Sequence, residues 1–385
     1  MDMVMEMEAE TETEIGMGLE VQLKKEHKVE TQEEDEATKK RKIELDPEER
    51  KRLAEAEGVA KFKWLNEVDD EEELTDYYAY QAKQFRRFWE SLYLGRYGYF
   101  EDETTICAKR FTDKPARGGG CLISTLQIFS VKVTGLSGGL KFPLDVYGMV
   151  AIRDNLDHNR NIIFHRKRDN CQTLTQEDLS LVLTGPVRAV DLLDPVIFEV
   201  ELKVKSNIES QDRVLSLLAP PLDSPALIPD SCMFKKCYTS KLSTMELTVG
   251  HIFYSLEATI SVKVIEGSWL EDSHGQFTAS TDSIEDEKVV LLGFGDGKVP
   301  LDGDNILLSR SVVSAEYEEH LIVSVNTRQS KKAEDEAVEE HAVFTPLNMG
   351  RSYGELNVGF CKMQVTVAWS EALLLRSGMT MEVSL

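Results

Sequence analysis

Residues 142–174, FPLDVYGMVAIRDNLDHNRNIIFHRKRDNCQTL, and residues 183–205, LTGPVRAVDLLDPVIFEVELKVK, decide the fold class of this chain. Both stretches consist of short runs rich in Val, Ile and Phe that are separated by polar turns. Branched and aromatic side chains favour strands, whereas Gly, Pro, Asn and Asp favour the turns between them. Neither stretch contains a recognisable catalytic motif, so the sequence predicts an architecture here and leaves the chemistry open.

Later segments alternate between apolar and polar residues with a period of two. Val200, Leu202 and Val204 alternate with charged residues, and the same pattern recurs over 260–264 and 363–369. Strands with one buried and one solvated face, as in antiparallel sheets, show this alternation. We count on the order of a dozen such runs, separated by Gly and Pro turns. Residues 120–385 are therefore predicted to be a mainly β domain, an antiparallel β-sandwich that is either one large sandwich or two adjacent ones.

The first part of the chain has a different composition. Residues 1–58 are dominated by Glu, Lys, Met and Thr and contain almost no aromatic residues. They cannot bury enough apolar surface to offset the entropy of ordering, so we predict a disordered acidic tail. Residues 59–119 are predicted to be a helical leader and linker.

One amphipathic helix is expected within this leader. Apolar residues recur every three or four positions, at Leu74, Tyr78, Ala82, Phe85, Trp89 and Leu92. This spacing places the six side chains on one helix face. Because that face is rich in large aromatic residues, we expect it to pack on the β domain rather than to bind a separate partner.

Overall charge and composition exclude several classes of function. A formal net charge of −24 disfavours general binding to nucleic acids and to anionic membranes. No apolar run approaches the roughly 20 residues that span a bilayer, and the acidic N-terminus lacks the plan of a signal peptide. The six cysteines are scattered, unlike the dense framework of a small secreted domain. We therefore expect a cytoplasmic or nuclear protein with no membrane partner.

A short basic cluster interrupts the acidic tail. Lys39, Lys40, Arg41 and Lys42 are consecutive, and Arg50–Arg52 follow nearby. Runs of this kind are recognised by nuclear-import receptors, so the four residues are a candidate import signal. The alternative is a solvated charge run without a receptor.

A second group of cations lies in the β region. It consists of Arg153, Arg160, Arg166, Lys167 and Arg168. Together they could hold a phosphate group or an acidic segment of a partner, so we predict an anion or partner patch. The alternative is that these charges protect a strand edge from pairing with another chain.

Motifs for catalysis, cofactors and metals are missing. The chain contains no HExxH zinc motif and no GxSxG nucleophile elbow. GFGDG at 293–297 lacks the third glycine and the helix of a dinucleotide-binding loop, and we interpret it as a hairpin connection. Cys232 and Cys237 do not form a CxxC pair that would suggest zinc. We predict no catalytic, cofactor or metal residues, although a triad assembled from distant segments stays open.

Several segments resemble a known family. STLQIFSVKV, FPLDVYGMVAIRD, RNIIFHRKRDNCQTL, LTGPVRAV, DPVIFEVELKVK and VGFCKMQVTVAWSEA resemble a large cereal-grass family whose shared domain has no established function. The helix YYAYQAKQFRRFWESLY is similar to the leader that precedes this domain. A similar domain forms the C-terminal part of the barley jasmonate-induced ribosome-inactivating protein. The depurinating activity of that protein belongs to a separate N-terminal module, for which this chain lacks the length.

The resemblance implies stress or defence biology in grasses. We therefore expect a non-enzymatic protein-interaction domain with an unknown protein partner in such a pathway. The alternative is an enzyme directed at ribosomes or RNA, which the fusion in the barley protein suggests.

Overall fold

The computed structural model describes residues 76–115, 122–193, 195–222, 230–270, 273–295, 299–329 and 337–371. All of them lie in one unit, which runs from Val68 to Leu385. Within these ranges one α-helix, α3 (Tyr77–Tyr93), precedes the strands, and two short 3₁₀ turns, η1 (Arg168–Asn170) and η2 (Glu209–Gln211), lie between strands. Every ladder between the described strands is antiparallel, as the alternating sequence pattern predicts.

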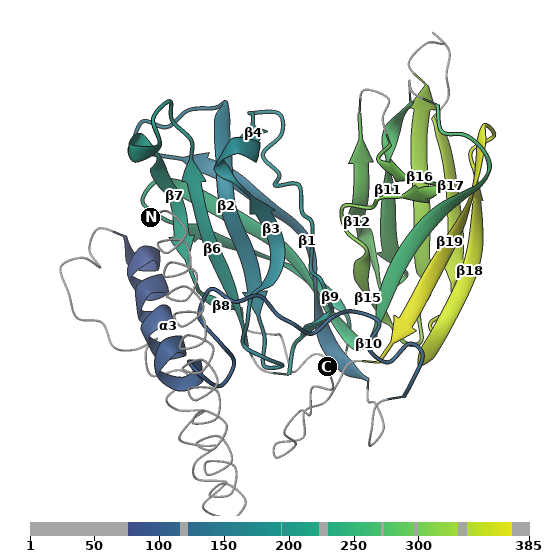
Figure 1. Cartoon of the computed structure of the whole chain (residues 1–385), viewed down its shortest axis with the longest axis horizontal. Helices are drawn as coiled ribbons and strands as arrows, with labels where there is room; N and C mark the ends of the chain where they lie inside the picture. Colours follow the sequence, from purple (N-terminus) through teal and green to yellow (C-terminus); the bar gives the residue numbers. More distant parts are fainter. Residues whose placement is uncertain are drawn as a thin grey trace, which may run out of the picture. The chain divides into compact units, whose positions relative to one another are not determined.

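The described strands form three sheets (Figure 1). The nine-stranded sheet contains β1 (Ile123–Leu136), β5 (Val190–Asp191), β9 (Cys232–Thr239), β10 (Ser243–Gly267), β13 (Leu301–Asp302), β14 (Asn305–Ile306), β15 (Val312–Glu316), β18 (Met349–Asn357) and β19 (Cys361–Ser370). The six-stranded sheet contains β2 (Leu144–Arg153), β3 (Asn161–Arg166), β4 (Gln172–Leu174), β6 (Val196–Val204), β7 (Arg213–Leu218) and β8 (Pro221–Leu222). The four-stranded sheet contains β11 (Ser273–Thr281), β12 (Ile284–Phe294), β16 (Leu321–Gln329) and β17 (Val338–Phe344).

The 25-residue strand β10 takes part in both halves of the domain (Figure 1). Its first half pairs with β1 and β9, and its second half pairs with β15, β14 and β19. The first half forms one hydrophobic core with the six-stranded sheet, and the second half forms another core with the four-stranded sheet. The prediction of an antiparallel sandwich therefore resolves into two sandwiches that share one strand.

A β-bulge in the middle of β10 connects the two cores. Thr125 of β1 opposes Ile252, and Ile123 opposes Ser255, so two residues of β10 face one residue of β1 between these pairs. Because side chains alternate with a period of two, one extra residue changes which residues face a core. In the first half of β10, Met245, Leu247 and Val249 lie in the first core, whereas Leu256, Ala258, Ile260 and Val262 in the second half lie in the other core, together with Ile252, which precedes the bulge.

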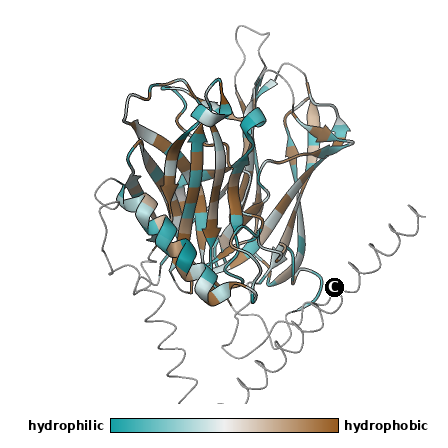
Figure 2. Ribbon diagram, turned by 60° about the vertical axis from the view of Figure 1, so that its left-hand side comes forward, coloured by the Kyte–Doolittle hydropathy of each residue, from teal (hydrophilic) through white to brown (hydrophobic). Residues whose placement is uncertain are grey.

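Helix α3 packs on the first sandwich. The Asp76 side chain accepts a hydrogen bond from the N–H of Ala79 and thereby caps the first turn. Phe85 and Trp89 are buried, and the helix contacts β7. The Trp89 indole N–H donates a 2.8 Å bond to the carbonyl of His158, which ties the helix to the turn after β2. Figure 2 shows the strands mainly in hydrophobic colours, and much of the helix in hydrophilic ones, as expected for a helix with one solvated face.

The fold-class prediction is confirmed, and two details are corrected. Leu92, expected on the packed face, is 37% exposed, whereas the next residue, Tyr93, stacks on His158. GFGDG does not connect a hairpin, because β12 and the next strand β13 belong to different sheets. No helix within the described ranges is long and apolar enough to cross a membrane. Residues 1–58 and Leu74 lie outside the described residues, and the predicted boundaries at 58 and 119 stay predictions.

Candidate functional site

The five cations predicted as one patch occupy two different places in the structure. Arg153 and Arg160 both pair with Glu199, at 2.6 Å each, and the Arg153 side chain is only 2% exposed. Arg168 instead pairs with Asp212 at 2.7 Å and lies beside η2. The structure therefore does not bring the five residues together as a single surface.

Arg166 and Lys167 complete this group. The Arg166 guanidinium lies 3.4 Å from the side-chain oxygen of Asn170. No ion pair within the described ranges involves either residue. The four candidate import residues, Lys39–Lys42, lie outside the described residues.

The Arg153 cluster is a structural junction. The Arg153 guanidinium also donates to the carbonyls of Phe100 at 2.6 Å and His158 at 2.9 Å. Burial raises the pKa of Glu199, but the charges and hydrogen bonds of Arg153 and Arg160 outweigh burial and hold the pKa below its usual range. The carboxylate is thus a permanent anion between two cations, with no proton to exchange near neutral pH.

A second buried cluster surrounds Arg188. Its guanidinium forms a bidentate pair with Asp154, at 2.5 and 2.8 Å, and reaches Asp157 at 3.4 Å. Nearby, the carboxylate of Glu257 accepts backbone hydrogen bonds from Lys109 at 2.7 Å and Ala189 at 2.8 Å. Burial raises the pKa of Glu257. This cluster joins the leader, the loop before β5 and the middle of β10.

Arg310 is a third buried arginine within the described ranges. It is 2% exposed, and its guanidinium donates a 2.6 Å bond to the carbonyl of Ile128, at a bulge in β1. Burial lowers the pKa of Arg310 to about 10. No ion pair within the described ranges involves this residue. The carbonyl of Ile128 also accepts a 3.1 Å bond from the side-chain amide of Gln127.

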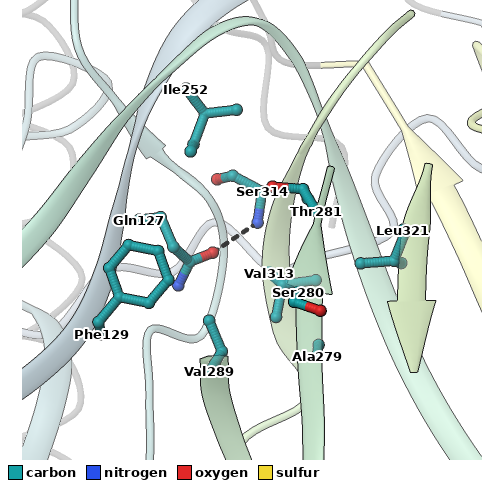
Figure 3. A pocket seen from close by; sticks show the side chains of 10 residues that line it. All are labelled: Gln127, Phe129, Ile252, Ala279, Ser280, Thr281, Val289, Val313, Ser314 and Leu321. Atoms are coloured by element: carbon teal, nitrogen blue, oxygen red, sulfur yellow. Dashed lines mark hydrogen bonds between the residues drawn. The ribbon is translucent and has the colours of Figure 1, made fainter. Parts of the chain in front are cut away.

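One small cavity lies between β1, β10, β11, β12, β15 and β16 (Figure 3). Its lining is mainly apolar, and the Gln127 side-chain oxygen beside it accepts a 2.8 Å bond from the N–H of Ser314. The cavity volume is about 10 Å³, which is about the space for one water molecule. No titratable side chain lines it. It can hold a water but not a substrate.

Cys232 and His251 are opposite each other on β9 and β10. Burial raises the pKa of the Cys232 thiol, which opposes formation of a nucleophilic thiolate. Burial also lowers the pKa of His251, so that the ring is neutral at pH 7. No hydrogen bond within the described ranges joins the two side chains, and those ranges contain no metal-binding group of three or more His, Cys, Asp or Glu residues.

The bulge of β10 displays exposed aromatic residues. Tyr254 has φ +39° and is 55% exposed, a backbone conformation that bulky residues rarely adopt. Its ring packs against that of Phe253 with centroids 4.0 Å apart. Tyr317, 37% exposed, donates its backbone N–H to the carbonyl of Tyr254 at 2.9 Å. We call Phe253, Tyr254 and Tyr317 the tyrosine patch.

Acidic residues border the tyrosine patch. Glu316 precedes Tyr317 at the end of β15, and Glu318 and Glu319 follow it in the turn. The hydroxyl of Ser231 donates to the Glu316 carboxylate and accepts from the N–H of Phe253 at 3.0 Å. No ion pair within the described ranges involves these three glutamates, which we call the acidic rim.

The comparison with protein families identifies the β region. Residues 125–367 match the family described as Domain of unknown function (DUF6598). The chain belongs to this family. The matched part of the DUF6598 domain contains the tyrosine patch, the acidic rim and the charged side chains of both buried clusters, whereas α3, Phe100 and Lys109 precede it.

Other comparisons add little to this assignment. No curated protein matches the DUF6598 chain. Among solved structures, human GIVD cytosolic phospholipase A2 aligns with a TM-score of 0.20 and 10% identity, over 66% of this chain and 33% of that chain. The same protein in complex with methyl gamma-linolenyl fluorophosphonate gives the same values. The DUF6598 chain thus spans about a third of that enzyme's length, and a TM-score this low relates neither fold nor function.

Sequence reasoning missed the tyrosine patch, although a signal for it was present. The core residues of β10 change from odd-numbered positions (Met245, Leu247, Val249) to even-numbered ones at Ile252. This change of phase indicates an irregularity in the middle of the strand, next to Phe253 and Tyr254. The phase change does not indicate which side chain would be exposed.

Proposed function

We propose that this DUF6598 domain is a non-enzymatic protein-interaction domain that binds its partner through the tyrosine patch. The observation that carries this proposal is the exposed ring of Tyr254 at positive φ. A non-glycine residue in this conformation costs on the order of 1 kcal/mol and persists only where the surrounding structure imposes it. Tyrosine is enriched in protein interfaces, because its ring buries a large apolar area while its hydroxyl can still form hydrogen bonds.

The rigidity of the site supports this function. The carbonyl of Tyr254 is held by Tyr317, and the N–H of the preceding residue, Phe253, is held by Ser231. These bonds hold the backbone, and the ring of Tyr254 packs on that of Phe253 with centroids 4.0 Å apart. An aromatic side chain held in this way loses little entropy on binding, which favours affinity. The buried charged side chains of the Arg153 and Arg188 clusters bond to one another and give no support for a reaction.

The biological setting is also a proposal. The resemblance to the cereal-grass family and to the C-terminal domain of the barley protein supports a role in grass stress or defence. We propose that the partner is a protein and that binding takes place in the cytoplasm or the nucleus.

Site-specific cross-linking tests the proposal. The full chain carrying the photoreactive residue p-benzoylphenylalanine at position 254 should cross-link to a discrete protein, whereas the same residue at position 353 should not. Tyr353 is a suitable control because it is 65% exposed on β18, outside the patch. The identified protein is then purified, and its binding should be lost with Tyr254→Gly and retained with Tyr353→Gly. Equal cross-linking at both positions, or depurination or cleavage of ribosomal RNA by the purified chain, would contradict the proposal.

A further inference from the structure

We infer that the tyrosine patch receives a cationic segment of the partner, with an arginine or lysine side chain against the faces of Tyr254 and Tyr317. This inference rests on the proposed function and specifies the chemistry of the partner. Its basis is the combination of two exposed aromatic rings with the acidic rim.

The first argument concerns the rings. An aromatic face attracts a guanidinium or ammonium group placed within about 6 Å of its centre. Tyr254 is 55% exposed and Tyr317 is 37% exposed, so part of each ring is open to a ligand. Each ring also offers apolar area to the aliphatic part of an arginine or lysine side chain.

The second argument concerns the charges. Glu316, Glu318 and Glu319 take part in no ion pair with a described residue. Behind the patch, His251 is neutral, because burial lowers its pKa, so it does not offset these charges. A cationic segment would therefore meet uncompensated negative charge next to exposed aromatic rings, and charge complementarity of this kind favours a cationic partner.

The same charges disfavour other occupants. A second copy of the chain, placed patch against patch, would bring two acidic rims together, and like charges at such a contact oppose association. A nucleic acid would bring phosphates to the rim, and the net charge of −24 adds to that repulsion. A basic segment of another protein is the occupant that both the rings and the rim favour.

Peptide binding to the full chain tests this inference. The probe is a glycine–serine peptide with arginine at every third position. Comparison peptides carry citrulline or glutamate instead of arginine, since citrulline keeps the shape of arginine without its charge. We expect the arginine peptide to bind at least about tenfold more tightly than the citrulline peptide, measured by fluorescence anisotropy. Amide chemical shifts should change at residues 253–255 and 316–319.

Matched variants separate the patch from general attraction to an acidic protein. Tyr254→Gly should weaken binding of the arginine peptide roughly tenfold. Glycine is the chosen replacement because it tolerates φ +39° without strain. Glu318→Lys should weaken binding of the arginine peptide by a similar factor. Glu177→Lys makes the same charge change at an exposed site outside the patch, and Tyr353→Gly removes an exposed ring elsewhere. These two controls should change the affinity less than about twofold.

Three results would overturn the inference. They are equal affinity for the arginine and citrulline peptides, equal effects of Glu318→Lys and Glu177→Lys, and binding of single-stranded RNA in preference to the arginine peptide. If the arginine peptide fails while cross-linking at position 254 still captures a partner that Tyr254→Gly releases, only the cationic chemistry is wrong. If that capture fails too, the proposed function is wrong.

Discussion

Tyr317 donates its backbone N–H to the carbonyl oxygen of Tyr254 at 2.9 Å, at the point where β10 leaves one hydrophobic core and enters the other. Before this point Met245, Leu247 and Val249 lie in the first core, and after it Leu256, Ala258 and Ile260 lie in the second core. The bond to Tyr317 holds the bulged residue in its positive-φ conformation. Tyr254 thus forms part of the bulge in β10 and also exposes an aromatic ring.

The strain at Tyr254 predicts a difference between two small replacements. Tyr254→Gly should give a free energy of unfolding about 1 kcal/mol higher than Tyr254→Ala, because only glycine adopts φ +39° without steric cost. Urea denaturation of both purified variants measures this difference. If the alanine variant is as stable as the glycine variant, the backbone at this position is not strained.

The Glu199 cluster predicts a large loss of stability. Glu199→Ala leaves Arg153 and Arg160 without their shared carboxylate, and breaking such a buried pair costs about 3–5 kcal/mol. The control is Glu355→Ala, which removes the exposed partner of Lys362 and should cost less than about 1 kcal/mol. Chemical denaturation compares the two, and similar losses would show that the Glu199 cluster is not a structural junction.

The packing of α3 on the first sandwich predicts that the stability of the protein depends strongly on Trp89. Trp89→Ala removes a fully buried ring and its bond to the carbonyl of His158, so we expect a loss of about 3–5 kcal/mol. Leu92→Ala, three residues later on the same helix but 37% exposed, should cost about 0.5 kcal/mol. Thermal unfolding measures both variants. Equal effects would mean that Leu92 belongs to the packed face, as its spacing in the sequence suggests.

Tyr147 predicts a stability change at alkaline pH. Burial, and the 2.7 Å hydrogen bond from its hydroxyl to Asp212, raise the pKa of Tyr147 to about 12. An unfolded tyrosine has a pKa of about 10, so the folded state retains a proton that the unfolded state loses between these values. This contribution to stability is present below about pH 10 and is lost as the pH rises towards about 12.

Denaturation at a series of pH values tests this dependence. Tyr147→Phe should lack the part of the alkaline decline that Tyr147 contributes, whereas Tyr353→Phe should keep it. Ultraviolet absorbance follows the ionisation of the phenol directly. An identical decline in the wild-type chain and in Tyr147→Phe would refute the prediction.

The basic cluster of the tail predicts a cellular distribution. Replacing Lys39, Lys40, Arg41 and Lys42 by glutamine should shift a fluorescently tagged chain from the nucleus to the cytoplasm, because import receptors bind exposed cations in an extended segment. Replacing Lys235 and Lys236, which are exposed on β9, controls for the loss of charge and should leave the distribution unchanged. Nuclear accumulation that survives the change at positions 39–42 would refute the import signal.

Local patterns predicted much of the fold. The alternation over 200–204, 260–264 and 363–369 identified β6, the second half of β10 and β19, and the spacing of Phe85 and Trp89 identified α3. These predictions succeeded because burial of one face imposes a period on the sequence of each element. The candidate site was less accessible. Arg153 and Arg168 are close in the sequence, but the structure pairs them with Glu199 and Asp212, on two other segments.

The sequence by itself determined the β-rich class, the amphipathic helix, most of its buried face and the absence of familiar catalytic motifs, because these depend on residue type and on spacing over a few positions. Only the tertiary structure decided that two cores share β10, that Arg153 is buried rather than displayed, and that Tyr254 faces solvent. Each of these outcomes depends on contacts between residues far apart in the chain. Tyr254 illustrates the reason, since it lies in a bulge opposite β1 and its carbonyl accepts a bond from Tyr317, and neither β1 nor Tyr317 adjoins it in the sequence.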